Sequence, residues 1–118
     1  MLINKDLMAA SATPLVLAIL SEGDSYGYAI IKRVRELSGD ELQWTDGMLY
    51  PVLHRLERLD YIKARWGTSE TGRKRKYYRI TPEGKAQLEE HRQQWQAVDR
   101  ALHALWNFIP TQAYRFGA

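Results

Sequence analysis

The sequence contains no cysteine, and only three of its 118 residues are histidines. Without thiols the chain forms no disulfide and offers no thiolate ligand, which excludes disulfide-stapled secreted scaffolds and cysteine-bound zinc domains. The histidines, at positions 54, 91 and 103, have no spacing that places two ligands on one face of a helix. We therefore expect no metal ion and no cofactor.

Catalytic motifs are missing as well. The chain has no glycine-rich phosphate loop and no serine with a plausible base. Its hydrophobic (45%) and charged (26%) fractions are those of an ordinary globular domain, which argues against wholesale disorder. We expect a folded protein that is not an enzyme.

Long hydrophobic runs do not occur either. The apolar segment of residues 7–20 is too short to span a bilayer. An acid, Asp6, precedes this segment and Pro14 interrupts it, and both features disagree with a signal peptide. The segment is therefore expected to be a core helix of a cytoplasmic protein that contacts no membrane.

Charge is present in abundance but is unevenly distributed. The chain has 17 Lys or Arg and 14 acids, and residues 54–79 hold nine of the bases and only three of the acids. This segment has a net charge of +6, and the remainder has a net charge of −3. Such asymmetry favours a polyanionic partner, either nucleic acid or an anionic membrane; the alternative is a solvated basic face without a partner.

Hydrophobic periodicity and capping residues predict four helices and one hairpin. The first helix ends near Glu22, and Pro14 either kinks it or occupies its first position behind Thr13. Ser25 is expected to cap the second helix, which ends at Gly39. The apolar face of the second helix comprises Ile30, Ile31, Val34 and Leu37.

The third helix is expected to open between Thr45 and Met48, because Pro51 is tolerated only near a first turn. Apolar residues recur at helical spacing and form its buried stripe, which comprises Leu49, Val52, Leu53, Leu56 and Leu59. The opposite face is polar and basic. Its candidate contact residues are Tyr50, His54, Arg55 and Arg58. A helix with one apolar and one basic side is suited to a phosphate-rich partner.

Two strands and a turn follow the third helix. Residues 62–67 alternate, with Ile62 and Trp66 on the same face, and residues 73–81 form a second strand. Residues 68–72 have the composition of a turn. The second strand begins with a basic run that comprises Arg73, Lys74, Arg75 and Lys76. Because two strands alone are marginally stable in water, the hairpin must pack on the helices.

Thr81 and Pro82 begin the last helix, in which a seam of residues recurs at alternating spacings of three and four. So narrow a seam suits a single partner helix. We expect that partner to be the same helix of a second subunit; the alternative is packing on its own domain. The residues assigned to the dimer interface are Leu88, Trp95, Val98, Leu102 and Leu105. The polar His91 and the terminal Ile109 share the same spacing.

This order of elements is that of a winged helix-turn-helix domain, a mainly α fold with a small β-hairpin (α+β). Residues 1–81 are expected to form the DNA-binding domain, residues 82–109 a long C-terminal dimerisation helix, and residues 110–118 a tail. In this arrangement the third helix enters the major groove, and the hairpin, or wing, contacts a neighbouring backbone. The exposed helix face then contacts base edges, and the basic run at residues 73–76 binds phosphates.

Three blocks of the sequence resemble the PadR-like transcriptional regulators. They are residues 26–28 (YGY), residues 47–57 (GMLYPVLHRLE) and residues 72–81 (GRKRKYYRIT), and their joint occurrence in this order is specific. The resemblance covers residues 12–107. It implies a bacterial winged-helix repressor that binds an inverted-repeat operator as a homodimer held by the C-terminal helix. The single final helix is similar to the short subgroup of the family.

Two positions depart from the family pattern. Met48 stands where Ser or Thr is usual, so a hydroxyl contact to phosphate is lost at this position. Asp60 stands where the family favours glycine, just before the first strand of the hairpin. Asp60 is still expected to form the turn, because aspartate tolerates left-handed backbone conformations better than most residues.

The resemblance also implies a small-molecule effector, because short members of the family sense flat aromatic compounds. Trp95 lies on the expected dimer seam and, with its symmetry mate, would stack such a compound; alternatively it only fills the interface. A different hypothesis for the whole chain is a non-enzymatic protein–protein interaction module with an incidental basic wing. DNA binding should weaken steeply with salt, whereas a hydrophobic protein contact scarcely responds to it.

Overall fold

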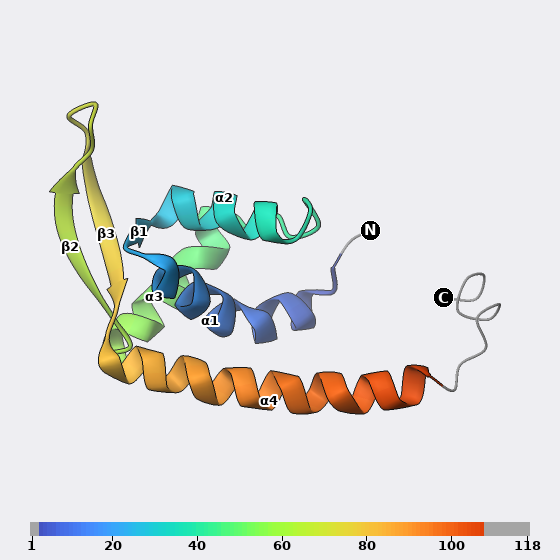
Figure 1. The fold of residues 1–118 in the computed structure, drawn as a ribbon. Coiled ribbons are helices and arrows are strands. Elements are labelled where there is room, and N and C mark those ends of the chain that lie inside the picture. Colours follow the sequence, from blue (N-terminus) through green and yellow to red (C-terminus); the bar gives the residue numbers. More distant parts are fainter. Residues whose placement is uncertain (1–2, 108–118) are drawn as a thin grey trace. The chain divides into compact units, whose positions relative to one another are not determined.

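The computed structural model describes residues 3–107, and over this range the chain forms four helices and three strands (Figure 1). In chain order they are α1 (Lys5–Glu22), β1 (Ser25–Tyr26), α2 (Gly27–Leu37), α3 (Asp46–Arg58), β2 (Ile62–Thr68), β3 (Lys74–Ile80) and α4 (Pro82–Trp106). The strands form one antiparallel sheet in the order β1–β3–β2. The predicted α+β winged-helix class is confirmed.

The chain divides into two compact units at the junction of Leu88 and Glu89. The first unit contains the sheet, helices α1 to α3 and the beginning of α4, and the second contains the rest of α4. α4 begins at Pro82, where the sequence predicts it, and its first residues fold with the first unit. The predicted helix end at Ile109 and the tail of residues 110–118 lie outside the described residues.

The core of the first unit is formed by one face of each of its three complete helices and by the sheet. Its largest fully buried side chains are Val16, Leu17, Leu20, Ile30, Val34, Leu49, Leu53, Leu56 and Ile62. The predicted apolar stripes are confirmed except at Leu37 and Leu59, which are 53% and 51% exposed. Leu37 is the last residue of α2 and Leu59 is the C-cap of α3, so the chain leaves the core at both positions.

The short strand β1 was not predicted. Ser25 pairs with Tyr78 and Tyr26 pairs with Tyr77, so the sheet has three strands rather than two. The prediction that Ser25 caps the second helix is wrong, because α2 begins at Gly27 and its N-cap Tyr26 forms no side-chain capping bond. The pairing instead satisfies backbone groups along the edge of β3.

The first helix begins well before Thr13. Asn4 caps α1 by accepting a 2.8 Å hydrogen bond from the N–H of Asp6, and Pro14 lies inside the helix. The alternative in which α1 starts behind Thr13 is therefore wrong. The predicted end at Glu22 is confirmed.

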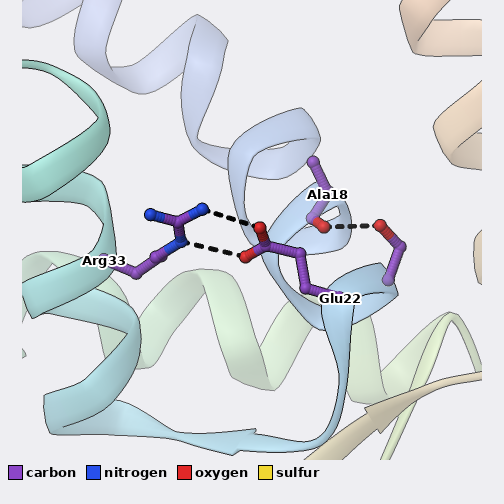
Figure 2. A network of polar contacts seen from close by, with 4 residues as sticks. Ala18, Glu22 and Arg33 are labelled. Carbon is purple, nitrogen blue, oxygen red and sulfur yellow. Dashed lines mark hydrogen bonds and ion pairs between the residues drawn. The ribbon is translucent and has the colours of Figure 1, made fainter.

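A bidentate ion pair joins the end of α1 to α2 (Figure 2). The guanidinium of Arg33 donates from Nε and Nη2 to the two carboxylate oxygens of Glu22 over 3.0 and 2.7 Å. These hydrogen bonds lower the pKa of Glu22 below its usual value. Beside the pair, the hydroxyl of Ser21 donates to the carbonyl of Ala18. An exposed pair adds little stability, but two parallel bonds restrict the direction of α2 relative to α1.

Thr81 anchors the start of α4 to the loop before β2. Its hydroxyl accepts a hydrogen bond from the N–H of Gly84 (3.0 Å) and donates to the carbonyl of Asp60 (2.6 Å). Asp60 has a positive φ of 59°, so the turn expected at this non-glycine position is confirmed. Gly84 approaches the same loop so closely that an added Cβ would overlap the backbone oxygen of Tyr61.

We predict that Gly84→Ala destabilises the first unit by about 2–3 kcal/mol, because the added methyl group meets backbone rather than a movable side chain. Gly47→Ala is the matched control, since its Cβ would meet only the Thr45 hydroxyl at 3.9 Å. That variant should be as stable as the parent or more so, because alanine is the better helix former. Urea unfolding followed by circular dichroism compares the variants. Equal free energies of unfolding for Gly84→Ala and the parent would contradict the prediction.

Candidate nucleic-acid interface

α3 begins where the sequence predicts. Thr45 is its N-cap, and the Thr45 hydroxyl accepts a 3.3 Å hydrogen bond from the N–H of Met48. Asp46 places a negative charge at the positive end of the helix dipole. Pro51 lies in the second turn, where the backbone hydrogen bond to the carbonyl of Gly47 cannot form. Because the apolar stripe of α3 is buried in the core, its opposite face is directed toward solvent.

Three of the four candidate contact residues on α3 share this solvent-exposed face. Tyr50, His54 and Arg58 recur every four residues, and all three are exposed. Within residues 3–107 none of these side chains forms a hydrogen bond or an ion pair. Their phenol, imidazole and guanidinium groups are therefore free to bond to a ligand.

Arg55 has a different environment. Its side chain is also exposed, but Nη2 donates a 2.6 Å hydrogen bond to the hydroxyl of Thr13 on α1. This contact joins residues that are 42 positions apart in the sequence. The guanidinium of Arg55 is thus already engaged in holding α1 against α3.

The wing consists of β2, β3 and the turn between them, and the two strands pair along their whole length. Ser69 closes the turn: its N–H donates to the carbonyl of Arg73 (2.8 Å), and its hydroxyl accepts from the N–H of Arg73 (3.1 Å). Gly72 has a positive φ of 83°, a conformation that favours glycine. The predicted strands are confirmed to within one residue at each end.

The basic run at residues 73–76 has two kinds of environment. Arg73 and Lys74 are exposed, and no described residue forms a hydrogen bond or ion pair with either side chain. Arg75 and Lys76 are half-buried and engaged. The guanidinium carbon of Arg75 lies 4.3 Å from the ring centroid of Tyr26, and the ammonium of Lys76 lies 3.6 Å from Glu57 Oε1 on α3. The first two cations of the run therefore have no partner among the described residues, whereas Arg75 and Lys76 hold the wing against Tyr26 and α3.

The Lys76–Glu57 pair connects the wing to α3. Glu57 Oε1 is buried and accepts no hydrogen bond from the described residues, so the ammonium of Lys76 supplies the compensating charge. Burial, and secondarily the charge of Glu57, raise the pKa of Tyr78 to about 12. The Tyr78 hydroxyl beside this pair therefore keeps its proton to a higher pH than that of an ordinary tyrosine.

A second cluster holds the other face of the wing. The rings of Tyr26 and Tyr77 meet edge to face, with centroids 5.6 Å apart. The guanidinium carbon of Arg65 lies 4.9 Å from the Tyr77 centroid, and Arg65 Nη2 lies 3.4 Å from Asp24 Oδ2. Together with Arg75, which lies over Tyr26, these contacts connect β1 to both strands of the wing.

A groove of about 690 Å³ separates the wing from the N-terminal ends of α2 and α3. Asp46 and Tyr50 line it on the helix side, and Trp66, Lys74 and Lys76 line it on the wing. Cations thus outnumber acids on its walls. The groove is open to a long, negatively charged ligand.

Trp66 is a site residue that sequence reasoning missed. Strand alternation places it on the face of Ile62, yet Ile62 is 1% exposed and Trp66 is 72% exposed. The tip of the hairpin extends past the helices, as Figure 1 shows, so the core that covers Ile62 does not reach Trp66. The signal in the sequence was an aromatic residue among basic ones in an alternating strand.

Residues 3–107 contain no group of three or more His, Cys, Asp or Glu side chains that could hold a metal ion. No helix in that range is long and apolar enough to cross a membrane.

Residues 16–90 match the family model described as the transcriptional regulator PadR-like family. The chain belongs to this family. Members of the PadR-like family are transcriptional regulators and not enzymes, so the predicted family and the predicted lack of enzymatic activity are both confirmed. The chain is a DNA-binding transcriptional regulator.

The chain is also similar to individual proteins, two of which are transcriptional regulators. The chain is 35% identical over 101 residues to protein X of Lysinibacillus sphaericus, an uncharacterised protein, and the match covers 86% of this chain and 93% of that one. It is 33% identical over 90 residues to the transcriptional regulator YqjI of Escherichia coli, a match that covers 76% of this chain but 42% of YqjI. A solved transcriptional regulator from Clostridium thermocellum, Cth-833, has a TM-score of 0.79 at 33% identity, covering 92% of this chain and 100% of that one.

Met48, which departs from the PadR pattern, is explained by its position. Its side chain is half-buried against the core, and its N–H bonds to the Thr45 hydroxyl. A hydroxyl is therefore still present at this end of α3, where it caps the helix.

The predicted seam of this PadR-like protein is divided between the two units. Leu88 lies in the first unit and packs against the core there. In the second unit Trp95 is partly buried, and Val98, Leu102 and Leu105 are 52%, 38% and 65% exposed. These four residues form an apolar stripe along α4, and we call them the α4 stripe.

Proposed function

We propose that this PadR-like protein is a dimeric repressor that binds an inverted-repeat operator and releases it when a flat aromatic compound binds between its subunits. The observation that supports this most directly is the set of free hydrogen-bonding and cationic groups on α3, next to two free cations on the wing. Base edges require donors and acceptors in the major groove, and phosphates require cations beside it. The first unit presents both.

α3 is the proposed recognition helix. Its exposed face enters the major groove, where Arg58 donates two bonds to guanine and Tyr50 and His54 contact neighbouring base edges. Arg55 is proposed to orient α3 rather than to contact a base, because its guanidinium is bonded to Thr13.

The wing is the proposed phosphate clamp. Arg73 and Lys74 are free to bind the backbone. Arg75 and Lys76 keep the wing in place through Tyr26 and Glu57, so they act on DNA binding mainly through the position of the hairpin.

Selection of random duplexes by the purified protein should enrich an inverted repeat with half-sites about 10 base pairs apart. On that duplex, Arg58→Ala should relax the preference at one position and weaken binding by about 1–3 kcal/mol, because a bidentate contact is lost. Arg73→Ala should weaken binding to every duplex and reduce the slope of log affinity against log salt by about 1.

Arg55→Ala tests the positioning role on the same helix. It should weaken binding without relaxing the preference at a single base position, because the Arg55 guanidinium bonds to Thr13 and holds α3 in place. Enrichment of no sequence, together with binding that scarcely responds to salt, would contradict the proposal and favour a protein-interaction module.

The proposed dimer rests on the α4 stripe. Its members follow spacings of three and four and present apolar surface that a second copy of α4 would bury. The dimer would then offer two recognition helices to successive turns of DNA, about 34–36 Å apart.

We predict that Leu102→Asp converts the dimer to a monomer, because the interface would have to bury an unpaired carboxylate. Gln96→Asp introduces the same charge on an exposed residue outside the α4 stripe and should leave the dimer intact. Sedimentation equilibrium distinguishes the two masses. A parent protein that sediments as a monomer would refute the proposed dimer.

The proposed effector site is Trp95. In the dimer, Trp95 and its symmetry mate would stack a planar aromatic molecule between two indoles. Such a ligand would relieve repression if it favoured a dimer in which the separation of the recognition helices no longer matches DNA.

Planar aromatic compounds should therefore quench the intrinsic tryptophan fluorescence, and Trp95→Ala should abolish the quenching. Trp66→Phe, which changes a tryptophan on the wing and leaves α4 intact, should retain it. Absence of quenching across a broad panel of planar aromatics would rule out the effector site and leave the DNA proposal standing.

A further inference from the structure

Trp66 is the most exposed large hydrophobic side chain among the described residues, at 72%. It lies on β2, on the sheet face that also presents Lys74 and Lys76. Lys76 is its direct cross-strand partner, and Lys74 is its diagonal neighbour toward the tip. The indole therefore lies among cations rather than in an apolar cluster.

Trp66 also lines two hollows. The first is the 690 Å³ groove between the wing and α3, which Tyr50 lines from the other side. The second has a volume of about 460 Å³ and is bounded by Trp66, Gly67, Thr68 and Lys74. Trp66 and Lys74 line both hollows, so a ligand that extends along either hollow reaches both side chains.

The charged and apolar side chains that line these hollows indicate which kind of ligand binds there. A single exposed apolar side chain is ordinary, but this one shares its groove with a run of cations as well as with tyrosine rings; the cations of the run are Arg73, Lys74, Arg75 and Lys76. A second copy of the wing is a poor occupant, because it would bring the same positive charges together. The backbone of duplex DNA is complementary, since it alternates phosphates, which bind cations, with sugars whose carbon atoms pack on an aromatic ring.

We propose that Trp66 packs against the deoxyribose that lies between the phosphates bound by Arg73 and Lys74. This inference rests on the proposed contact of the wing with DNA and adds an uncharged contact to it. Burial of the indole removes apolar surface from water without releasing counterions, so its share of the affinity is independent of salt. The expected share is a factor of about ten.

The test titrates a fluorescent duplex at several salt concentrations. Trp66→Ala should bind about tenfold more weakly at every concentration, with the parent's slope of log affinity against log salt. Trp66→Phe should retain most of the affinity, because a ring is kept. Leu37→Ala is the matched control, since Leu37 is also exposed and lines neither hollow, and it should bind like the parent.

The outcomes separate this inference from the proposal on which it rests. If the affinity of the parent does not fall as salt rises, the proposed DNA contact itself fails. If the parent responds to salt and Trp66→Ala binds equally well, only the role of Trp66 is overturned. A changed salt slope in Trp66→Ala would also overturn it, because the indole would then act by positioning the cations.

The exposed position of Trp66 predicts that Trp66→Ala unfolds at the same temperature as the parent. If that variant does not fold, Trp66→Gln makes the same comparison, because it keeps a long side chain and lacks only the ring. The same tenfold loss is expected of it, and parent-like affinity would overturn the inference.

Discussion

Where the wing meets α3, the buried carboxylate oxygen of Glu57 lies 3.6 Å from the ammonium of Lys76. This oxygen of a partly exposed carboxylate is removed from water and is compensated by the Lys76 charge, so the pair helps to hold the wing at one position relative to α3. The width of the groove, the free cations of the wing and the exposed indole of Trp66 all depend on that position. Burial of Tyr78 beside the pair raises its pKa to about 12, so its hydroxyl keeps the proton to a higher pH than that of an ordinary tyrosine.

Strand alternation distributes the remaining charges. Arg75 lies over Tyr26 on one face of the wing, and Lys76 pairs with Glu57 on the other, so adjacent residues hold opposite faces. The free cations, Arg73 and Lys74, are the members of the run nearest the turn. A hairpin that is held on both faces by residues close to its turn loses little conformational entropy when the turn end binds a ligand. The wing is therefore well suited to bind a phosphate backbone.

Local signals in the sequence account for much of the fold. Pro51 restricted the start of α3 to residues 45–48 and Thr81 marked the start of α4, and both Thr45 and Thr81 serve as caps in the structure. The composition of residues 68–72 marked the turn of the wing, where Gly72 has a positive φ. Contacts between distant residues have no such signal. The β1 strand exists only because it pairs with β3, and the bond from Arg55 to Thr13 spans 42 residues.

Local sequence patterns also did not predict which side chains are exposed to solvent. Alternation placed Trp66 on the correct face of β2, but its exposure depends on how far the helices extend beneath the sheet. Likewise, four consecutive bases indicated a phosphate-binding wing without showing that Arg75 and Lys76 are engaged. The class of site follows from composition and spacing, whereas the role of each residue follows from packing.

In the proposed function, different side chains of this surface provide the affinity for DNA and the preference for one DNA sequence. Arg73, Lys74 and Trp66 would bind any duplex, so sequence preference has to come from the exposed face of α3. That helix has 13 residues, and its free side chains on this face reach only a few base pairs. Since each bidentate contact discriminates by roughly 1–3 kcal/mol, one recognition helix selects a site weakly. A second helix on the same operator doubles this discrimination energy, which multiplies the two specificity ratios. Under the proposed function, the α4 stripe is therefore as necessary for a specific operator as the residues that contact the bases.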